Sequence, residues 1–381
     1  MQSFTIGENQ AGQRLDKFLR KYFPSAGSGF LFRMMRKKNI TLNGSKAEGG
    51  EILKVGDTVE SFFSEETYAK MRAEGTSGAG EATSAAREGA SAVYAGGRLS
   101  QTGQSREFGA VRVLYEDEDV LALFKPFGVA TQTGGEIRYS LNEWMLDDLV
   151  RRGRITQEEL RTFHPSVANR LDRNTTGLVL CGISLKGSQE LARILREHLG
   201  EKVYYVLCAG AFEAPLRAEH LLLRDSGSNR SEVLTAAPAG GKRLPGAGDP
   251  EPSPAAPEGA QRIVTEYQPI ASNGEVTLLE ARLITGKTHQ IRAQLSFLGH
   301  PIVGDPKYGS RALNDLYRRK YKVKGQLLHA GAFTFPEAEG AGRLARLAGR
   351  RIVCPLPEPF AGVVRDLFPE TDLCLHGNLE G

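Results

Sequence analysis

Residues 65–107 constrain the fold of this 381-residue chain more than any other stretch. They include "EGTSGAGEATSAAREGASAVYAGGRLSQTGQS", which is rich in Gly, Ser and Ala and poor in large apolar side chains. Such a stretch cannot bury enough surface to offset the entropy that a chain loses on folding. We therefore predict a flexible linker over residues 64–108, between a small unit over residues 1–63 and a larger unit over residues 109–381.

A second stretch of biased composition lies inside the larger unit. Residues 236–261 read "AAPAGGKRLPGAGDPEPSPAAPEGAQ" and stand between two runs with strand character. Pro, Gly and Ala dominate this stretch, which is typical of loops and linkers. We predict a surface insertion that does not divide the larger unit.

The small unit contains two short amphipathic patterns, each followed by a turn. Leu15, Phe18, Leu19 and Tyr22 recur at helical spacing, as do Leu31, Met34 and Met35 in the next pattern. The dipeptide Asn43-Gly44 then predicts a tight hairpin. The unit is therefore expected to be a small α+β domain.

Basic side chains gather on the second predicted helix and on the hairpin. They are Arg33, Arg36, Lys37, Lys38 and Lys46. A generic basic helix is usually a solvated charged face. Here the order helix, basic helix, "ITLNG" and "LKVGDTV" resembles the S4-like RNA-binding domain over residues 12–62. The resemblance implies that these side chains grip structured RNA through backbone charge and shape.

The larger unit mixes strand and helix patterns. Apolar and β-branched runs such as "VLALFK", "YYVLCAG", "TLLEARLIT" and "LLHAGAFTF" predict strands, whereas "SLKGSQELARILREHL" and "HQIRAQLSFLG" predict helices. Because strands often follow one another directly, we expect an α+β fold with a mixed, largely antiparallel sheet flanked by helices and loops. Phosphate-binding glycine motifs are absent from the sequence, so no nucleotide cofactor is expected.

Asp172 lies in "NRLDRNTTGLVL", where a polar turn leads into a buried strand. Such an aspartate usually accepts hydrogen bonds from nearby backbone N–H groups. A second polar group, Arg292, lies beside the buried stripe of a helix that Thr288 is placed to cap. A buried arginine needs an anionic partner, which a structural carboxylate could supply.

Four motifs in order, "FKPFGVAT", "RLDRNTTGLVL", "KVYYVLCAG" and "TGKTHQIRAQLSFLGHPIVGDPKYG", resemble the RluA-type pseudouridine synthases over residues 111–336. The resemblance implies the pseudouridine synthase fold and an RNA isomerase. It makes Asp172 the catalytic aspartate, Tyr204 the stacking tyrosine with Tyr205 as the alternative, and Arg292 the partner of Asp172. Arg170 and Arg173 would then meet RNA phosphates or structural acids. The chain departs from the family at Asn169, where His is common.

The implied reaction needs one ionised carboxylate and neither a cofactor nor a metal. The carboxylate attacks the uracil or the sugar, or it removes a ribose proton, and the sequence leaves these routes open. The target uridine must also be flipped out of its stack.

RNA is the expected partner, and an S4-like domain on such a catalytic domain favours large-subunit ribosomal RNA over tRNA. The alternatives are a tRNA-directed synthase, a catalytically silent RNA- or ribosome-binding factor, and a glycosidic hydrolase, which would need a second carboxylate. The cysteines are scattered, which indicates a reducing cytoplasm. The sequence shows no basic region followed by an apolar leader and no run of ~18 apolar residues, so we expect neither secretion nor membrane insertion. We also expect a monomer. The histidines, including His164, His289, His300 and His329, do not follow metal-ligand spacing, so structural roles and no metal are expected.

The basic helix can be tested directly. Replacing Arg36, Lys37 and Lys38 with Ala should weaken RNA binding and flatten its salt dependence, because fewer counterions are released from the RNA. Affinity measured over a series of salt concentrations checks this. An unchanged slope would mean that the helix faces something other than RNA.

Overall fold

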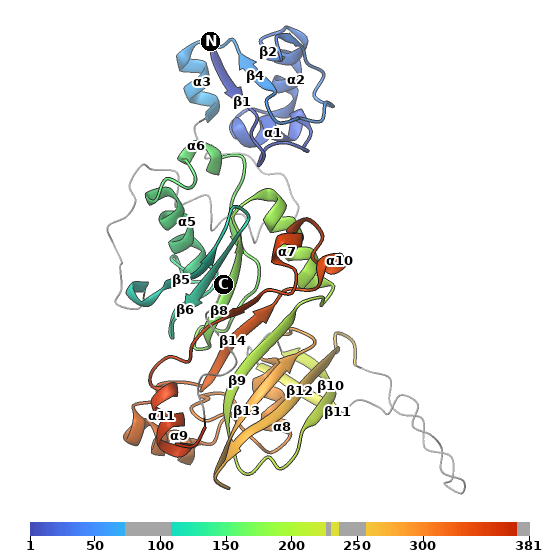
Figure 1. Cartoon of the computed structure of the whole chain (residues 1–381). Coiled ribbons are helices and arrows are strands. Elements are labelled where there is room, and N and C mark those ends of the chain that lie inside the picture. Colours follow the sequence, from blue (N-terminus) through green and yellow to red (C-terminus); the bar gives the residue numbers. More distant parts are fainter. Residues whose placement is uncertain (73–107, 226–229, 236–256, 372–381) are drawn as a thin grey trace, which may run out of the picture.

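The computed structural model describes residues 1–72, 108–225, 230–235 and 257–371 (Figure 1). Residues 73–107 and 236–256, which make up most of the predicted linker and most of the predicted insertion, lie outside the described residues. Among the helices of the described ranges, none is long and apolar enough to cross a membrane.

In residues 1–72, helices pack against a four-stranded antiparallel sheet of order β1-β4-β2-β3. The elements are β1 (Gln2–Thr5), α1 (Leu15–Tyr22), α2 (Ser28–Arg36), β2 (Ile40–Leu42), β3 (Ser45–Lys46), β4 (Thr58–Ser61) and α3 (Glu65–Arg72). Phe18 and Leu19 of α1 and Met35 of α2 are buried in one core, which confirms the two predicted amphipathic helices. Asn43 and Gly44 both have positive φ, at 52° and 71°, and form the predicted hairpin between β2 and β3.

The predicted linker began too early, because its first residues form helix α3. Met71 of this helix is buried, and the ring of Tyr68 contacts the rings of Tyr22 and Phe23. Tyr68 and Met71 are three residues apart and therefore share one face of the helix. The Gly-, Ser- and Ala-rich composition of the long stretch concealed this short apolar face at its start.

In the described residues from 108 onward, an 11-stranded sheet forms the centre of the larger unit. Its main order is β11-β10-β12-β13-β9-β14-β8-β6-β5, with β15 paired to β14 and β7 paired to β8. The strands are β5 (Arg112–Glu116), β6 (Val120–Lys125), β7 (Ser166–Val167), β8 (Thr176–Gly182), β9 (Glu201–Ala209), β10 (Leu216–Asp225), β11 (Arg230–Thr235), β12 (Gln261–Ser272), β13 (Val276–Leu283), β14 (Leu328–Thr334) and β15 (Arg351–Val353). Among them, β8 and β14 pair in parallel and the other pairs are antiparallel, which confirms the predicted mixed sheet.

Helices flank this sheet, and its buried side chains form several clusters, two of which meet at the centre of the sheet. The helices are η1 (Phe108–Ala110), α5 (Leu141–Arg151), α6 (Gln157–Leu160), α7 (Leu185–Arg196), α8 (Gln290–Phe297), α9 (Arg311–Tyr321), α10 (Ala338–Ala341), η2 (Gly342–Leu347) and α11 (Phe360–Leu367). Side chains of α5 and α7 pack with β6 and β8, whereas side chains of α8 pack with β9 and β13. Figure 1 shows α5 and α7 beside β6 and β8, and α8 behind β13. These two clusters meet along β8, β14 and β9.

The N-terminal unit contacts the larger unit through α3 and through the loop after β1 (Figure 1). Arg72, the last residue of α3, forms an ion pair with Glu158 of α6. Its guanidinium carbon lies 5.1 Å from the ring centres of both Tyr22 and Tyr68. Stacking on aromatic rings and pairing with a carboxylate together favour a single orientation of this arginine.

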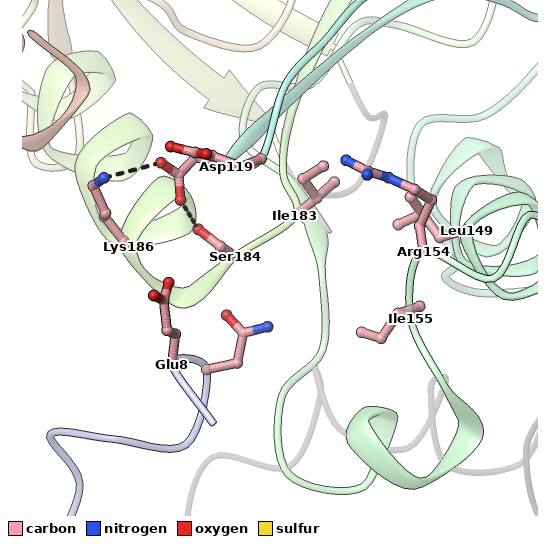
Figure 2. A pocket seen from close by; sticks show the side chains of 10 residues that line it. Glu8, Asp119, Leu149, Arg154, Ile155, Ile183, Ser184 and Lys186 are labelled. Atoms are coloured by element: carbon pink, nitrogen blue, oxygen red, sulfur yellow. Dashed lines mark hydrogen bonds and ion pairs between the residues drawn. The ribbon is translucent and has the colours of Figure 1, made fainter. Parts of the chain in front are cut away.

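A polar cavity of about 260 Å³ lies beside this contact (Figure 2). Glu8 and Asn9 line it from the N-terminal side, and Asp119, Ser184 and Lys186 line it from the other side. Lys186 Nζ lies 3.2 Å from a carboxylate oxygen of Asp119, and the Ser184 hydroxyl donates to the other oxygen. Arg346 also pairs with Asp119, at 2.8 Å, so this carboxylate is held by ion pairs within the fold.

The parallel junction between β8 and β14 depends on a glycine. Gly177 of β8 pairs with Ala330 of β14 and has a φ of +122°. A Cβ atom at this position would lie 2.3 Å from the carbonyl oxygen of Ala330. Gly177 therefore permits the close approach that joins the two parts of the sheet.

His329 stabilises the same junction from β14. Its side chain is fully buried, with Nδ1 2.8 Å from the Thr176 hydroxyl and Nε2 2.9 Å from the carbonyl oxygen of Cys354. Since a carbonyl oxygen only accepts, Nε2 carries the proton and Nδ1 accepts from Thr176. This confirms the structural interpretation of His329. Burial lowers the pKa of its imidazole to about 4.

We predict that His329 makes the stability of the fold depend on pH. Its folded pKa of about 4 lies below the ordinary value of 6.5, so the unfolded chain binds more protons between these values and stability falls as the pH is lowered through them. The full effect is about 3 kcal/mol. Urea unfolding from pH 7 to pH 4 should show a smaller loss for His329→Gln, which does not titrate, and parallel profiles for the two proteins would contradict this.

Candidate active site

Asp172 lies in the turn that leads into β8, and hydrogen bonds fix this turn from several sides. The Thr131 hydroxyl accepts from the N–H of Leu171 at 3.1 Å and donates to the carbonyl of Leu171 at 2.9 Å. The N–H of Thr175 donates to the carbonyl of Asp172 at 3.0 Å. β8 then enters the core. The carboxylate is therefore presented by a rigid turn, with 23% of its side chain exposed.

Lys125, at the end of β6, holds the other side of the turn. Its side chain is fully buried, and its Nζ donates to the carbonyl oxygens of Pro126, Val129 and Arg173 at 3.2, 2.8 and 3.0 Å. Burial lowers the pKa of Lys125 to about 7, although the nearby Asp172 carboxylate acts in the opposite direction. Sequence reasoning missed this residue, even though it lies within the motif "FKPFGVAT".

The residues beside Asp172 have separate roles. Asn169 bridges to β8: its Oδ1 accepts from the N–H of Leu180 at 2.7 Å, and its Nδ2 donates to the carbonyl of Leu178 at 3.3 Å. The Nε of Arg173 donates to the carbonyl of Gly128 at 2.8 Å. Arg170 is exposed and makes no ion pair with the described residues. In the described part of the chain, neither arginine therefore pairs with Asp172.

Arg292, from α8, connects Asp172 to a second carboxylate. Its NH1 lies 2.7 Å from Oδ2 of Asp172, whereas Nε and NH2 lie 2.7 and 2.9 Å from the two carboxylate oxygens of Asp305. Arg292 is 4% exposed and Asp305 is fully buried. Burial disfavours the charged guanidinium, but Asp305 and Asp172 outweigh this effect and raise the pKa of Arg292. The arginine therefore stays charged beside Asp172.

Both partners considered for Arg292 are thus present at once. The structural carboxylate is Asp305, which sequence reasoning did not single out. It also accepts from the N–H groups of Lys307 and Tyr308, at 2.8 and 3.0 Å. Burial alone would raise the pKa of Asp305, but Arg292 and these N–H groups lower it. The signal was available, because a buried arginine required a carboxylate and "GDPKYG" follows the helix closely.

The predicted start of α8 was wrong by one residue. Thr288 does not cap the helix; the position before the helix belongs to His289, whose backbone is left-handed with φ 60° and whose side chain makes no cap. The side chain of Gln290, the first residue of α8, holds the preceding loop, because its Oε1 accepts from the N–H of Lys287 at 3.1 Å. The left-handed residue turns the His289 side chain towards Asp172, with Nε2 3.8 Å from Oδ2.

Tyr204 and Tyr205 lie on opposite faces of β9, as the alternation of a strand requires. Tyr204 is partly exposed, and burial together with the charge of Asp172 raises the pKa of its hydroxyl. Tyr205 is 2% exposed and its ring packs against Gly331. Of the two tyrosines, Tyr204 is the one whose ring can reach a ligand beside Asp172.

The N-terminal candidates lie apart from this site on their own unit. Arg33, Arg36, Lys37, Lys38 and Lys46 are all exposed, and none of them forms an ion pair with a residue in the described ranges. Their charges are therefore available to an external polyanion.

The arrangement around Asp172 provides one accessible carboxylate, held beside a fixed positive charge and an aromatic ring. Such a carboxylate can act as a nucleophile or remove a proton. Asp305 is buried and fully engaged, so it cannot serve as the second carboxylate of a hydrolase. The described residues contain no group of three or more His, Cys, Asp or Glu side chains that could hold a metal ion.

Asp305 should matter more for stability than Asp172 does. Asp305→Asn leaves the buried Arg292 without its bidentate carboxylate, and we expect a loss of about 3–5 kcal/mol in the free energy of unfolding. Asp172→Asn removes the partly exposed partner and should cost about 1 kcal/mol. Urea unfolding of the two variants checks this, and equal losses would contradict it.

Known proteins are similar to this chain in sequence. The family model described as RNA pseudouridylate synthase matches residues 119–297, which include Asp172, Tyr204 and Arg292. The ribosomal large subunit pseudouridine synthase C of Vibrio cholerae is 26% identical over 88% of this chain and 89% of its own length. An uncharacterized RNA pseudouridine synthase of Mycoplasma pneumoniae is 26% identical over 95% of this chain and 97% of its own.

A solved structure supports the fold. Human RNA pseudouridylate synthase domain containing 4 aligns with a TM-score of 0.50 and 20% identity, over 67% of this chain and 92% of that one. The matched family model and the named relatives together support an RNA pseudouridine synthase, an isomerase that converts uridine in RNA to pseudouridine.

Proposed function

We propose that this enzyme modifies uridines of large-subunit ribosomal RNA, with Asp172 as its catalytic carboxylate. The contact between Arg292 and Asp172 carries the assignment, because it pairs a partly exposed carboxylate on a rigid turn with a buried guanidinium. The relatives named ribosomal large subunit pseudouridine synthase C favour ribosomal RNA as the substrate.

The reaction needs only groups that this site contains. The bond from N1 of uracil to C1′ of ribose breaks, a bond from C5 to C1′ forms, the C5 proton leaves and N1 gains a proton. Asp172 starts this sequence by attacking the uracil or the sugar, or by removing a ribose proton. Each of these routes needs the ionised carboxylate, and Arg292 donates a hydrogen bond to its Oδ2 at 2.7 Å.

Tyr204 is the proposed stacking platform for the flipped uracil. Its ring is partly exposed, its hydroxyl is influenced by the Asp172 charge, and aromatic stacking offsets part of the cost of taking a base out of its helix. Burial of the hydroxyl favours its neutral form.

Binding of the RNA is assigned to two surfaces. Residues 1–63 are proposed to act as an S4-like module whose exposed basic residues, Arg33, Arg36, Lys37, Lys38 and Lys46, contact phosphates. Arg170 and Arg173, beside Asp172, are proposed to contact phosphates near the target uridine. The ion pair of Arg72 with Glu158 would hold the first surface in register with the second.

We predict that Asp172→Asn abolishes isomerisation and leaves RNA binding nearly intact. Arg292 keeps its two bonds to Asp305 in this variant, so the site should retain its shape. Tritium release from C5 of uracil, in transcripts of large-subunit ribosomal RNA and of tRNA, measures the activity. Asp315→Asn, which changes an exposed aspartate on α9, is the matched control and should keep full activity.

Release from ribosomal transcripts by the wild type, but not by Asp172→Asn, is the expected result. Turnover by Asp172→Asn would exclude Asp172 as the catalytic group. Release from tRNA alone would change the substrate class and keep the site.

A further inference from the structure

His289 occupies an unusual place in the site. It is one of the few described residues other than glycine with a left-handed backbone, at φ 60°, and it stands directly before α8. Its side chain is 9% exposed. A strained backbone that turns a nearly buried imidazole towards the reacting carboxylate is a typical feature of functional sites. The reaction outlined above uses no histidine.

A chain of hydrogen bonds fixes which ring nitrogen carries the proton. The N–H of Ser231 donates to the Tyr308 hydroxyl oxygen at 2.7 Å, and this hydroxyl lies 3.1 Å from Nδ1 of His289. Among the described residues, Nδ1 is the only acceptor within reach of the Tyr308 proton. We assign the Tyr308 hydroxyl as the donor to Nδ1, which places the proton of a neutral imidazole on Nε2.

The Nε2–H group points into the site without a hydrogen bond. Oδ2 of Asp172 is 3.8 Å away, which is too long for one, and this oxygen already accepts from Arg292 at 2.7 Å. In the described ranges, Nε2 has no other polar partner. Burial lowers the pKa of His289, as do Arg292 and Lys307, whereas Asp172 and Asp305 oppose them. The imidazole is therefore a neutral donor beside the catalytic carboxylate.

We propose that His289 recognises the flipped base, with its Nε2–H donating to a carbonyl oxygen of uracil. The inference rests on the proposed function, because it requires a uracil beside Asp172. Uracil carries carbonyl oxygens at C2 and C4, and both accept hydrogen bonds. Cytosine keeps the C2 carbonyl but carries an amino group at C4, so a contact at C4 would in addition discriminate against cytosine. A site built around a fixed donor rejects a base that cannot accept from it.

Sulfur substitution in the RNA tests this contact. Three synthetic hairpins carry the uridine that the wild type modifies as uridine, 2-thiouridine or 4-thiouridine, and chromatography of the digested nucleosides gives kcat/KM for each. Sulfur is a weak acceptor, so the wild type should lose about tenfold on one thio substrate. His289→Ala should lose about tenfold on uridine, and its further loss on that thio substrate should be less than twofold.

Two further variants separate recognition from folding. Tyr308→Phe keeps the ring beside Arg292 but removes the hydroxyl that fixes the imidazole proton, so it should also reduce the selective loss on the thio substrate. His198→Ala changes another left-handed histidine, which lies exposed between α7 and β9, and should behave like the wild type.

The outcomes are distinct. If His289→Ala no longer distinguishes uridine from one of the two thio substrates, whereas the wild type does, the proposal is supported. The position of the sulfur then identifies the carbonyl that His289 contacts. Equal losses by His289→Ala on all three hairpins would mean that His289 only supports the fold, which overturns the proposal and keeps the proposed function. If the wild type isomerises no uridine in ribosomal RNA or tRNA, the proposed function fails and this inference fails with it.

Discussion

The buried guanidinium of Arg292 is the interaction on which the rest of the site depends. A buried charge is tolerated only with well-placed partners, and Asp305 supplies two of its three short contacts. The third reaches Asp172, which is 120 residues away in the sequence. Because α8 and the turn before β8 belong to different parts of the core, this contact forms only when both parts have joined at β14 and β9.

The polar side chains around the carboxylate form hydrogen bonds mainly with the backbone. Lys125 binds three carbonyl oxygens, and Thr131 pairs with both main-chain groups of Leu171. These bonds compensate the burial of polar groups and also restrict the turn that carries Asp172. The same logic applies to His289, whose proton is fixed by Tyr308. The hydrogen bonds of Lys125, Thr131 and Tyr308 therefore both stabilise the fold and orient the groups around Asp172.

Sequence patterns predicted much of the fold because burial follows periodicity. The alternating runs became strands, the two amphipathic patterns became α1 and α2, and Asn43-Gly44 became a hairpin. The errors occurred where local and tertiary preferences compete. Composition alone placed α3 in the linker, although Tyr68 and Met71 pack on the N-terminal core. Thr288 has a good capping side chain, but the left-handed His289 begins α8 instead.

The sequence by itself determined that Asp172 follows a turn into a buried strand, that Arg292 needs an anionic partner and that the ordered motifs resemble one enzyme family. Only the tertiary structure decided that Asp305 and Asp172 share this arginine, that Tyr204 rather than Tyr205 is partly exposed, and that Lys125 and His289 join the site. Residue type and spacing express what a side chain requires. Which groups meet that requirement depends on how distant strands pair, and a linear pattern does not contain that pairing.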